Sequence, residues 1–251
     1  MRQITEGGGM ARQTAPKRRR RERGSIDPDD IVAGAFELAD EVSIDNLSMP
    51  MLGKHLGVGV TSIYWYFRKK DDLLNAMTDR ALREYLLAVP LPKSEDWRES
   101  LTQYAHTMRK AFLSNPILVD LILIRATLGP RYSELGAKHI EGLVARLVDA
   151  GLTFDDGFDT FSALQLHLHG SIVLTRLHEK SKASDPDART YYEDLAISPE
   201  STPILAQAAA HGHTGGAPDD RNFEFGLRCI LDHAERLIES RNAEATPRGA
   251  A

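Results

Sequence analysis

A short run of hydroxyl-bearing and aromatic side chains follows a glycine-rich turn, Gly57-Val58-Gly59. The run contains Thr61, Ser62, Tyr64, Trp65 and Tyr66. Hydroxyls can bind phosphate oxygens, and Thr methyl or aromatic carbon can contact a thymine methyl group. A helix of about seven residues points consecutive side chains around its whole circumference, so several of these must be exposed. The residue types therefore suit contact with double-stranded DNA.

A second set of candidate contacts is the basic run near the N-terminus. It consists of Lys17, Arg18, Arg19, Arg20 and Arg21. Residues 1–24 contain eight Lys or Arg and two Glu, a net +6, whereas the whole chain carries −5, so the rest is acidic at −11. Clustered cations displace counterions from DNA. The alternative is a solvated disordered tail, but the position directly before a candidate DNA-contacting unit favours an arm that follows phosphates.

The elements that must position the run 61–66 are three helices. Asp27 and Pro28 begin a first helix of about fifteen residues, and Ser43 to Asn46 break it. Ser48 caps a second helix, Met49 to Leu56, and the glycine turn leads to a third from Val60 to Phe67. Two short helices joined by a tight turn after a supporting helix can place the last one in the major groove. A plain helical hairpin is the alternative.

Helical periodicity continues to the C-terminus, and we expect an all-α fold. The expected helices begin at Asp71 and then span Trp97–Phe112, Ile117–Leu128, Leu135–Val148, Phe154–Lys180, Ile204–Ala210 and Asp220–Arg241. The sequence predicts a disordered arm (1–24), a helix-turn-helix domain (25–75), a larger helical domain for effector binding and dimerisation (76–242) and a disordered tail (243–251).

Composition excludes several classes of protein. Cys229 is the single cysteine, so an intramolecular disulfide and a cysteine-based zinc site are impossible, and we expect it to be buried. The chain has no secretory signal and no apolar run long enough to cross a bilayer, so we expect a cytoplasmic protein without a membrane partner. It also has no nucleophile elbow, phosphate-binding glycine loop or metal-ligand spacing. We therefore expect no enzyme activity, catalytic residue, cofactor or metal.

The segment Leu47 to Leu74 resembles the helix-turn-helix of the TetR family. The resemblance rests on the Leu56-Gly57-Val58 turn, on Ile63-Tyr64 with Phe67, on Lys70 and on the Leu73-Leu74 pair. The remainder is similar to the C-terminal domain of the tetracycline-repressor subgroup. The similar pieces are Trp97-Arg98, Leu128-Gly129-Pro130, Asp149 to Leu152 and Phe223 to Leu227.

The resemblance implies that Ser62, Tyr64 and Lys70 bind phosphates. It implies that Thr61, Trp65 and Tyr66 lie at the groove. Tetracycline repressors read bases with an Arg and a Gln where this chain has Pro50 and Val60, so we expect a different operator in which Val60 meets a thymine methyl group. The expected DNA contacts are thus the basic arm and Ser48, Val60, Thr61, Ser62, Tyr64, Trp65, Tyr66 and Lys70.

The resemblance also implies a homodimer and a small-molecule effector. Residues expected to line the effector pocket are Leu86, Tyr104, Met108, Phe112, Thr127, Leu128 and His167, which suit a mostly apolar ligand. The His and Glu that bind a magnesium–drug chelate in tetracycline repressors correspond to Thr127 (or Ile122) and Leu174, so tetracycline itself is not expected. Two long apolar stripes, 154–180 and 223–241, could form a four-helix bundle between subunits.

The sequence therefore predicts a repressor that binds an operator in double-stranded DNA and leaves it when an unidentified small molecule binds. Two alternatives share the fold: a transcriptional activator and a ligand-independent DNA-binding protein. An architectural DNA-binding protein would show equal affinity for all sequences, whereas a regulator would prefer a short palindrome. An enzyme with an incidental helix-turn-helix is the remaining alternative.

Overall fold

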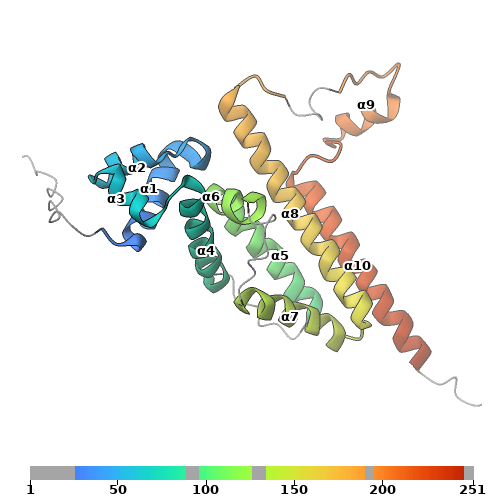
Figure 1. The fold of residues 1–251 in the computed structure, drawn as a ribbon. Coiled ribbons are helices and arrows are strands. Elements are labelled where there is room, and N and C mark those ends of the chain that lie inside the picture. The colour runs from blue at the N-terminus through green and yellow to red at the C-terminus, as the bar shows by residue number, and fades with distance from the viewer. Residues whose placement is uncertain (1–25, 89–95, 126–133, 190–194, 246–251) are drawn as a thin grey trace, which may run out of the picture.

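The computed structural model describes residues 26–88, 96–125, 134–189 and 195–245 (Figure 1). Within these ranges all regular structure is helical, as the sequence predicts. The first four helices form an N-terminal unit: α1 (Pro28–Asn46), α2 (Met49–Leu56), α3 (Val60–Tyr66) and α4 (Lys70–Ala88). The remaining helices form a C-terminal unit: α5 (Trp97–Leu113), α6 (Pro116–Leu118), η1 (Val119–Arg125), α7 (Glu134–Asp149), α8 (Phe154–Ser184), α9 (Pro203–Ala210) and α10 (Asp220–Ala245).

Local capping chemistry sets the starts of the first two helices. The Asp27 side chain accepts a hydrogen bond from the amide of Asp29 over 2.8 Å, and the Ser48 hydroxyl accepts one from the amide of Met51. Both caps satisfy amides that have no partner within the helix. These predicted starts are confirmed.

The predicted break at the end of α1 is a kink within the helix. Ser43 has φ 71° and ψ 161°, while helical structure continues to Asn46. For a residue with a Cβ this conformation costs roughly 1–3 kcal/mol and persists only where neighbouring contacts hold it. The predicted break is confirmed at Ser43, where the backbone is not helical, but the prediction was wrong for residues 44–46, because the chain resumes helical structure after the kink.

Two hydrophobic clusters stabilise the two units. The N-terminal cluster gathers buried residues from all four helices, including Ile31, Leu38, Leu52, Ile63, Phe67, Leu73 and Met77. Ile117 and Leu121 also belong to it, although they come from α6 and η1. The second cluster joins α5, α7, α8 and α10 through residues such as Leu101, Phe112, Leu147, Leu164 and Phe223. Because α6 and η1 contribute to both clusters, they are the packed connection between the units.

The segment predicted as one helix, Ile117–Leu128, differs in the structure. A single turn, α6, passes into the π-helical η1, which ends at Arg125. A π-helix is rare and is frequently found at functional sites. Periodicity counting cannot separate it from an α-helix over seven residues.

Two long helices dominate the C-terminal unit. Helices α8 and α10 run side by side along it, and α9 lies apart from the helical bundle (Figure 1). Helix α8 ends at Ser184 and α10 at Ala245, both beyond their predicted ends. The predicted disordered tail therefore begins too early, since residues 243–245 are helical. No helix in the described part of the chain is long and apolar enough to cross a membrane.

Candidate nucleic-acid interface

The turn between α2 and α3 depends on two glycines. Gly57 has φ 69° and ψ 30°, a left-handed conformation that ends α2. The amide of Val58 donates to the Gly53 oxygen over 3.0 Å, and a Cβ on Gly53 would come within 3.2 Å of the Val58 oxygen. Gly57 thus ends α2, and Gly53 allows the close approach of the Val58 oxygen in the turn that leads to α3.

Helix α3 has one buried face and one broad exposed face. Ile63 is fully buried and Phe67, the residue after the helix, is 9% exposed, so both anchor α3 in the N-terminal cluster. Thr61 and Ser62 are exposed, and so are the three aromatic residues: Tyr64 at 43%, Trp65 at 84% and Tyr66 at 41%. The predicted division of this run into inward and outward residues is confirmed.

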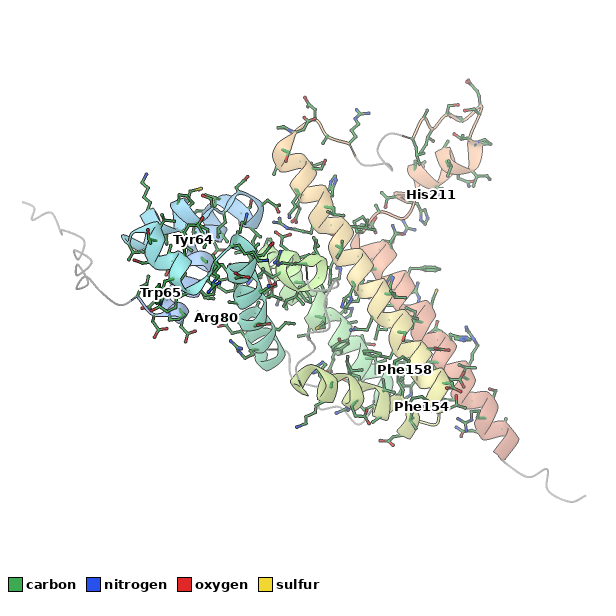
Figure 2. All side chains as sticks on the ribbon, in the orientation of Figure 1. Tyr64, Trp65, Arg80, Phe154, Phe158 and His211 are labelled. Carbon is green, nitrogen blue, oxygen red and sulfur yellow. The ribbon has the colours of Figure 1, made fainter. Side chains whose placement is uncertain are left out.

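The exposed face of α3 lies at the end of the molecule away from α8 and α10 (Figure 2). Tyr64 and Trp65 project from that end. No part of the described chain covers Trp65, so its large apolar surface is available to a partner. An exposed aromatic residue on a rigid, well-anchored helix suits a partner with a groove of helical width.

Other predicted DNA contacts occupy defined positions around α3. Ser48 is half-buried and caps α2, while Val60 opens α3 and is also half-buried. Lys70 opens α4, and its Nζ donates to the main-chain oxygen of Asp45 over 3.0 Å. The basic run 17–21 lies outside the described residues. That each of these residues contacts DNA stays a prediction.

Three further cations were absent from the predicted contacts. Lys54, Arg68 and Lys69 are exposed on α2 and in the segment between α3 and α4. The sequence signal for Arg68 and Lys69 is the run Arg68-Lys69-Lys70, in which only Lys70 is predicted to contact DNA. The structure shows that the first two are the more exposed, whereas Lys70 is half-buried against α1.

The residues predicted to line an effector pocket divide into three groups. Tyr104, Met108 and Phe112 are buried on the inner face of α5. Thr127 and Leu128 lie outside the described residues, as does the side chain of Leu86. The third group is His167, on α8.

Tyr104 donates a hydrogen bond to Oε1 of Gln165 over 3.0 Å, and its ring centroid lies 5.6 Å from that of His139. Burial lowers the pKa of His139. Sequence reasoning missed Gln165 and His139 because they are distant in the chain.

The side chain of His167 on α8 packs against α10. Its ring stacks on Phe223 with centroids 5.3 Å apart, and its Nε2 is 2.9 Å from the Phe223 oxygen. Gly226 makes room for it, since a Cβ there would lie 2.3 Å from the ring. His167 thus has a structural role in helix packing, and its predicted contact with an effector is untested.

Two other expectations concern metal and thiol chemistry. In the ranges that the structure describes, no three His, Cys, Asp or Glu side chains form a group able to hold a metal ion. His211 Nδ1 lies 2.8 Å from the main-chain oxygen of Gln207, and His213 Nε2 lies 2.8 Å from Nη2 of Arg221. Cys229 is exposed on α10, so its predicted burial was wrong: it lies on the outer surface of a helix that sequence alone treats as core.

Two family models match the chain. Residues 31–77 match the model described as bacterial regulatory proteins of the tetR family. Residues 89–237 match the tetracyclin repressor-like C-terminal domain. The chain belongs to the TetR family. Members of this family are transcriptional regulators rather than enzymes.

Curated relatives agree with this assignment. An HTH-type transcriptional repressor of Mycobacterium tuberculosis is 59% identical over 93% of this chain and 90% of its own length. The tetracycline repressor protein class G of Vibrio anguillarum is 35% identical over 84% of this chain and 95% of its own. Both alignments extend across the two units of the TetR-family fold.

Solved structures share the fold. A possible TetR-family transcriptional regulator of Streptomyces coelicolor superposes with a TM-score of 0.63 at 24% identity, covering 84% of this chain and all of that one. ActR of the same organism in complex with actinorhodin gives a TM-score of 0.61 at 24% identity, over 85% of this chain and 98% of that one. At this identity the likeness establishes the fold alone.

Proposed function

We propose that this TetR-family regulator is a repressor that binds operator DNA through α3 and leaves it when a small, mostly apolar molecule binds the C-terminal unit. The observation that carries the proposal is that α3 exposes one face while its opposite face is anchored in the core. Trp65 is 84% exposed, whereas Ile63 on the same helix is 0% exposed. A regulator needs such a rigid element with its recognition surface uncovered.

DNA contacts divide by chemistry. Thr61, Trp65 and Tyr66 offer methyl and aromatic carbon to base edges, and Val60 can meet a thymine methyl group but cannot form a hydrogen bond. Ser62, Tyr64 and Lys70 offer donors to phosphate oxygens, and Ser48 lies at the N-terminus of α2, where a phosphate is favoured by the free amides. Lys17 to Arg21 would supply further phosphate contacts. With Pro50 and Val60 in place of base-reading polar side chains, the operator differs from that of tetracycline repressors.

Effector binding is assigned to the inner face of α5. Tyr104, Met108 and Phe112 offer apolar surface, and Gln165 and His139 offer polar groups close to the Tyr104 ring. Sites of this composition take largely apolar ligands and orient them with few polar contacts. ActR, which shares the fold, has been crystallised with actinorhodin. Binding there would lower operator affinity by a coupling free energy of about 1–3 kcal/mol.

A homodimer is part of the proposal. On α8, Leu166 is 75% exposed, and Leu174 and Leu177 follow eight and eleven residues later, so the three share one face. Phe225 is exposed on the adjacent α10. An apolar face of this kind on two long packed helices suits an isologous four-helix interface. We place the dimer in the cytoplasm, where a bacterial regulator meets its operator.

One experiment tests the proposed function. Duplexes bound by the full chain are selected from random DNA, and the selected site is then used to screen small molecules that release it. A short palindrome with strong preference over unrelated DNA is expected, together with at least one largely apolar releasing compound. Equal affinity for all sequences would instead indicate an architectural DNA-binding protein.

A further inference from the structure

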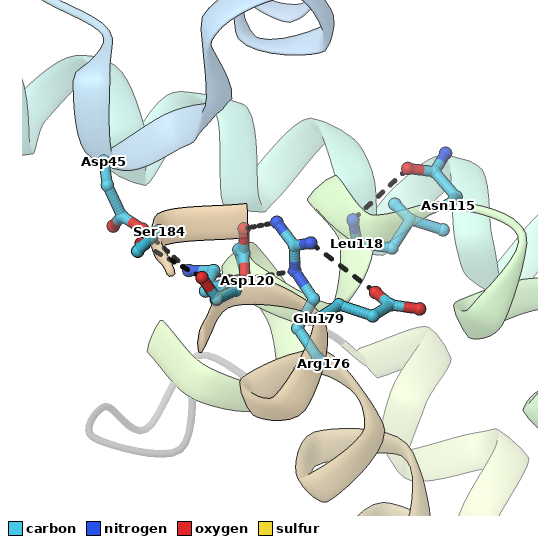
Figure 3. Close-up of polar contacts among 8 residues, drawn as sticks. Asp45, Asn115, Leu118, Asp120, Arg176, Glu179 and Ser184 are labelled. Carbon is cyan, nitrogen blue, oxygen red and sulfur yellow. Dashed lines mark hydrogen bonds and ion pairs between the residues drawn. The ribbon is translucent and has the colours of Figure 1, made fainter. Parts of the chain in front are cut away.

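An ion-pair network connects α8 with the end of α1 (Figure 3). Its centre is Asp120 of η1, whose side chain is 4% exposed. Arg176 of α8 donates to both carboxylate oxygens, from Nε over 3.1 Å and from Nη2 over 2.8 Å. Lys180 Nζ lies 2.9 Å from one of the same oxygens. Because an unpaired charge buried this deeply is strongly unfavourable, opening this half of the network would destabilise the fold.

The other half of the network reaches the N-terminal unit. Lys180 Nζ donates to Oδ2 of Asp45 over 2.8 Å, and the Asp45 side chain is 67% exposed. This hydrogen bond lowers the pKa of the Asp45 carboxyl. When the bond opens, Lys180 retains Asp120 as its counter-charge, so no buried charge is left alone. The contact between α8 and α1 is therefore one that water and salt can break.

Asp45 lies in the kinked end of α1. Ser43, two residues earlier, has the left-handed φ of 71°, and such backbone persists only where contacts hold it. Two lysines hold this end: Lys70 of α4 binds the main-chain oxygen of Asp45, and Lys180 of α8 binds its carboxylate. Lys70 is also a proposed phosphate contact. Asp45 thus links α8 to Lys70, the proposed phosphate contact.

We propose that Lys180 is a positioning residue for DNA binding: through Asp45 it fixes the orientation of the N-terminal unit relative to α8. The inference rests on the proposed function, since a dimer binds two half-sites only when both units have the correct orientation and spacing. Holding that orientation before binding reduces the entropy lost on binding. An exposed ion pair is weak, so the expected effect is about two- to fivefold in affinity.

The test is a double-mutant cycle on the full chain. Affinity for a duplex selected by the unmodified protein is measured for Asp45→Asn, Lys180→Gln and the double variant. Each single change is expected to lower affinity about two- to fivefold, and the double variant is expected to be no weaker than either, because both remove the same contact. Lys180→Arg retains a cation and is expected to preserve affinity. Asp40→Asn on α1 and Lys110→Gln on α5 are the control variants: they make the same charge changes at exposed positions outside the network.

Hydrogen exchange gives a second measurement that does not use DNA. Peptides covering residues 43–47 are expected to exchange faster in Asp45→Asn and Lys180→Gln than in the two control variants. If Lys180→Gln is destabilised through Asp120, Asp45→Asn carries the test, because it leaves the Asp120–Arg176 pair intact.

The outcomes are distinct. Unchanged exchange at 43–47 in Asp45→Asn would overturn the proposal, and so would additive effects of the two changes on affinity. If the unmodified protein selects no DNA sequence, the proposed function fails, while exchange at 43–47 still decides whether Lys180 holds this segment.

Discussion

Lys70 Nζ donates a hydrogen bond to the main-chain oxygen of Asp45, 3.0 Å away, and this bond connects the start of α4 with the end of α1. An ammonium group has three donors, so the same side chain can also bind a phosphate. Lys70 therefore connects the internal packing of the N-terminal unit with its proposed DNA contacts.

Replacing Lys70 by Met should weaken operator binding about tenfold. It should also lower the slope of log affinity against log salt concentration by about 2 per dimer, since each neutralised phosphate contributes about 0.9. Fluorescence anisotropy over a range of salt concentrations measures both quantities. Lys110→Met, at an exposed position of α5, serves as the control. An unchanged salt slope would show that Lys70 acts only on the packing of α1 against α4.

Trp65→Ala should separate DNA binding from stability. Because Trp65 is 84% exposed, the free energy of unfolding should stay within about 0.5 kcal/mol of the parent value, whereas operator affinity should fall about ten- to hundredfold. Ile63→Ala on the same helix is the matched contrast. It removes a fully buried side chain and should cost about 2–5 kcal/mol of stability. Denaturant unfolding and DNA binding are measured on both variants, and retained affinity in Trp65→Ala would remove that residue from the interface.

How far the sequence predicts the structure depends on the range of the interactions involved. The starts of α1 and α2 and the exposed face of α3 follow from neighbouring residues: Asp27, Ser48 and the turn at Gly57 act within a few positions. The pairing of Asp120 with Arg176 spans 56 positions and left no sequence signal. The exposure of Cys229 likewise depends on how α10 packs against α8. Local chemistry was therefore predictable, and the contacts between helices that are distant in the chain were not.

Removing apolar side chains from α8 should dissociate the dimer. Leu166→Asp together with Leu174→Asp places two charges on the exposed apolar face, and an unpaired charge buried in an interface is strongly unfavourable. Sedimentation velocity should show a monomer at concentrations where the parent is a dimer. Ile197→Asp, which alters an exposed apolar residue outside α8 and α10, should remain dimeric. A double variant that stays dimeric would place the interface elsewhere.

Ser43→Gly should raise stability by about 1 kcal/mol. Glycine adopts the left-handed φ of this position without strain, which relieves roughly 1–3 kcal/mol, while its extra freedom in the unfolded chain offsets about 0.4–1 kcal/mol. Ser43→Ala keeps the Cβ and should give no gain. Thermal and denaturant unfolding of the three proteins measure the difference. Equal stability of the Gly and Ala variants would show that the kink carries no strain.

Acidification should destabilise the protein in part through His169 on α8. Burial disfavours the imidazolium and lowers the pKa of His169 below its ordinary value of 6.5. The unfolded chain then binds the proton more readily than the folded one, so this contribution to stability is complete above pH 6.5 and is lost as the pH falls below it.

In His169→Asn the residue no longer titrates. Unfolding free energies measured between pH 7.5 and about pH 5 should therefore fall less steeply for this variant than for the parent. His139→Asn on α7 should act in the same direction, because burial lowers that pKa too. Parallel curves for the parent and His169→Asn would show that His169 takes up its proton equally well in the folded and unfolded chain.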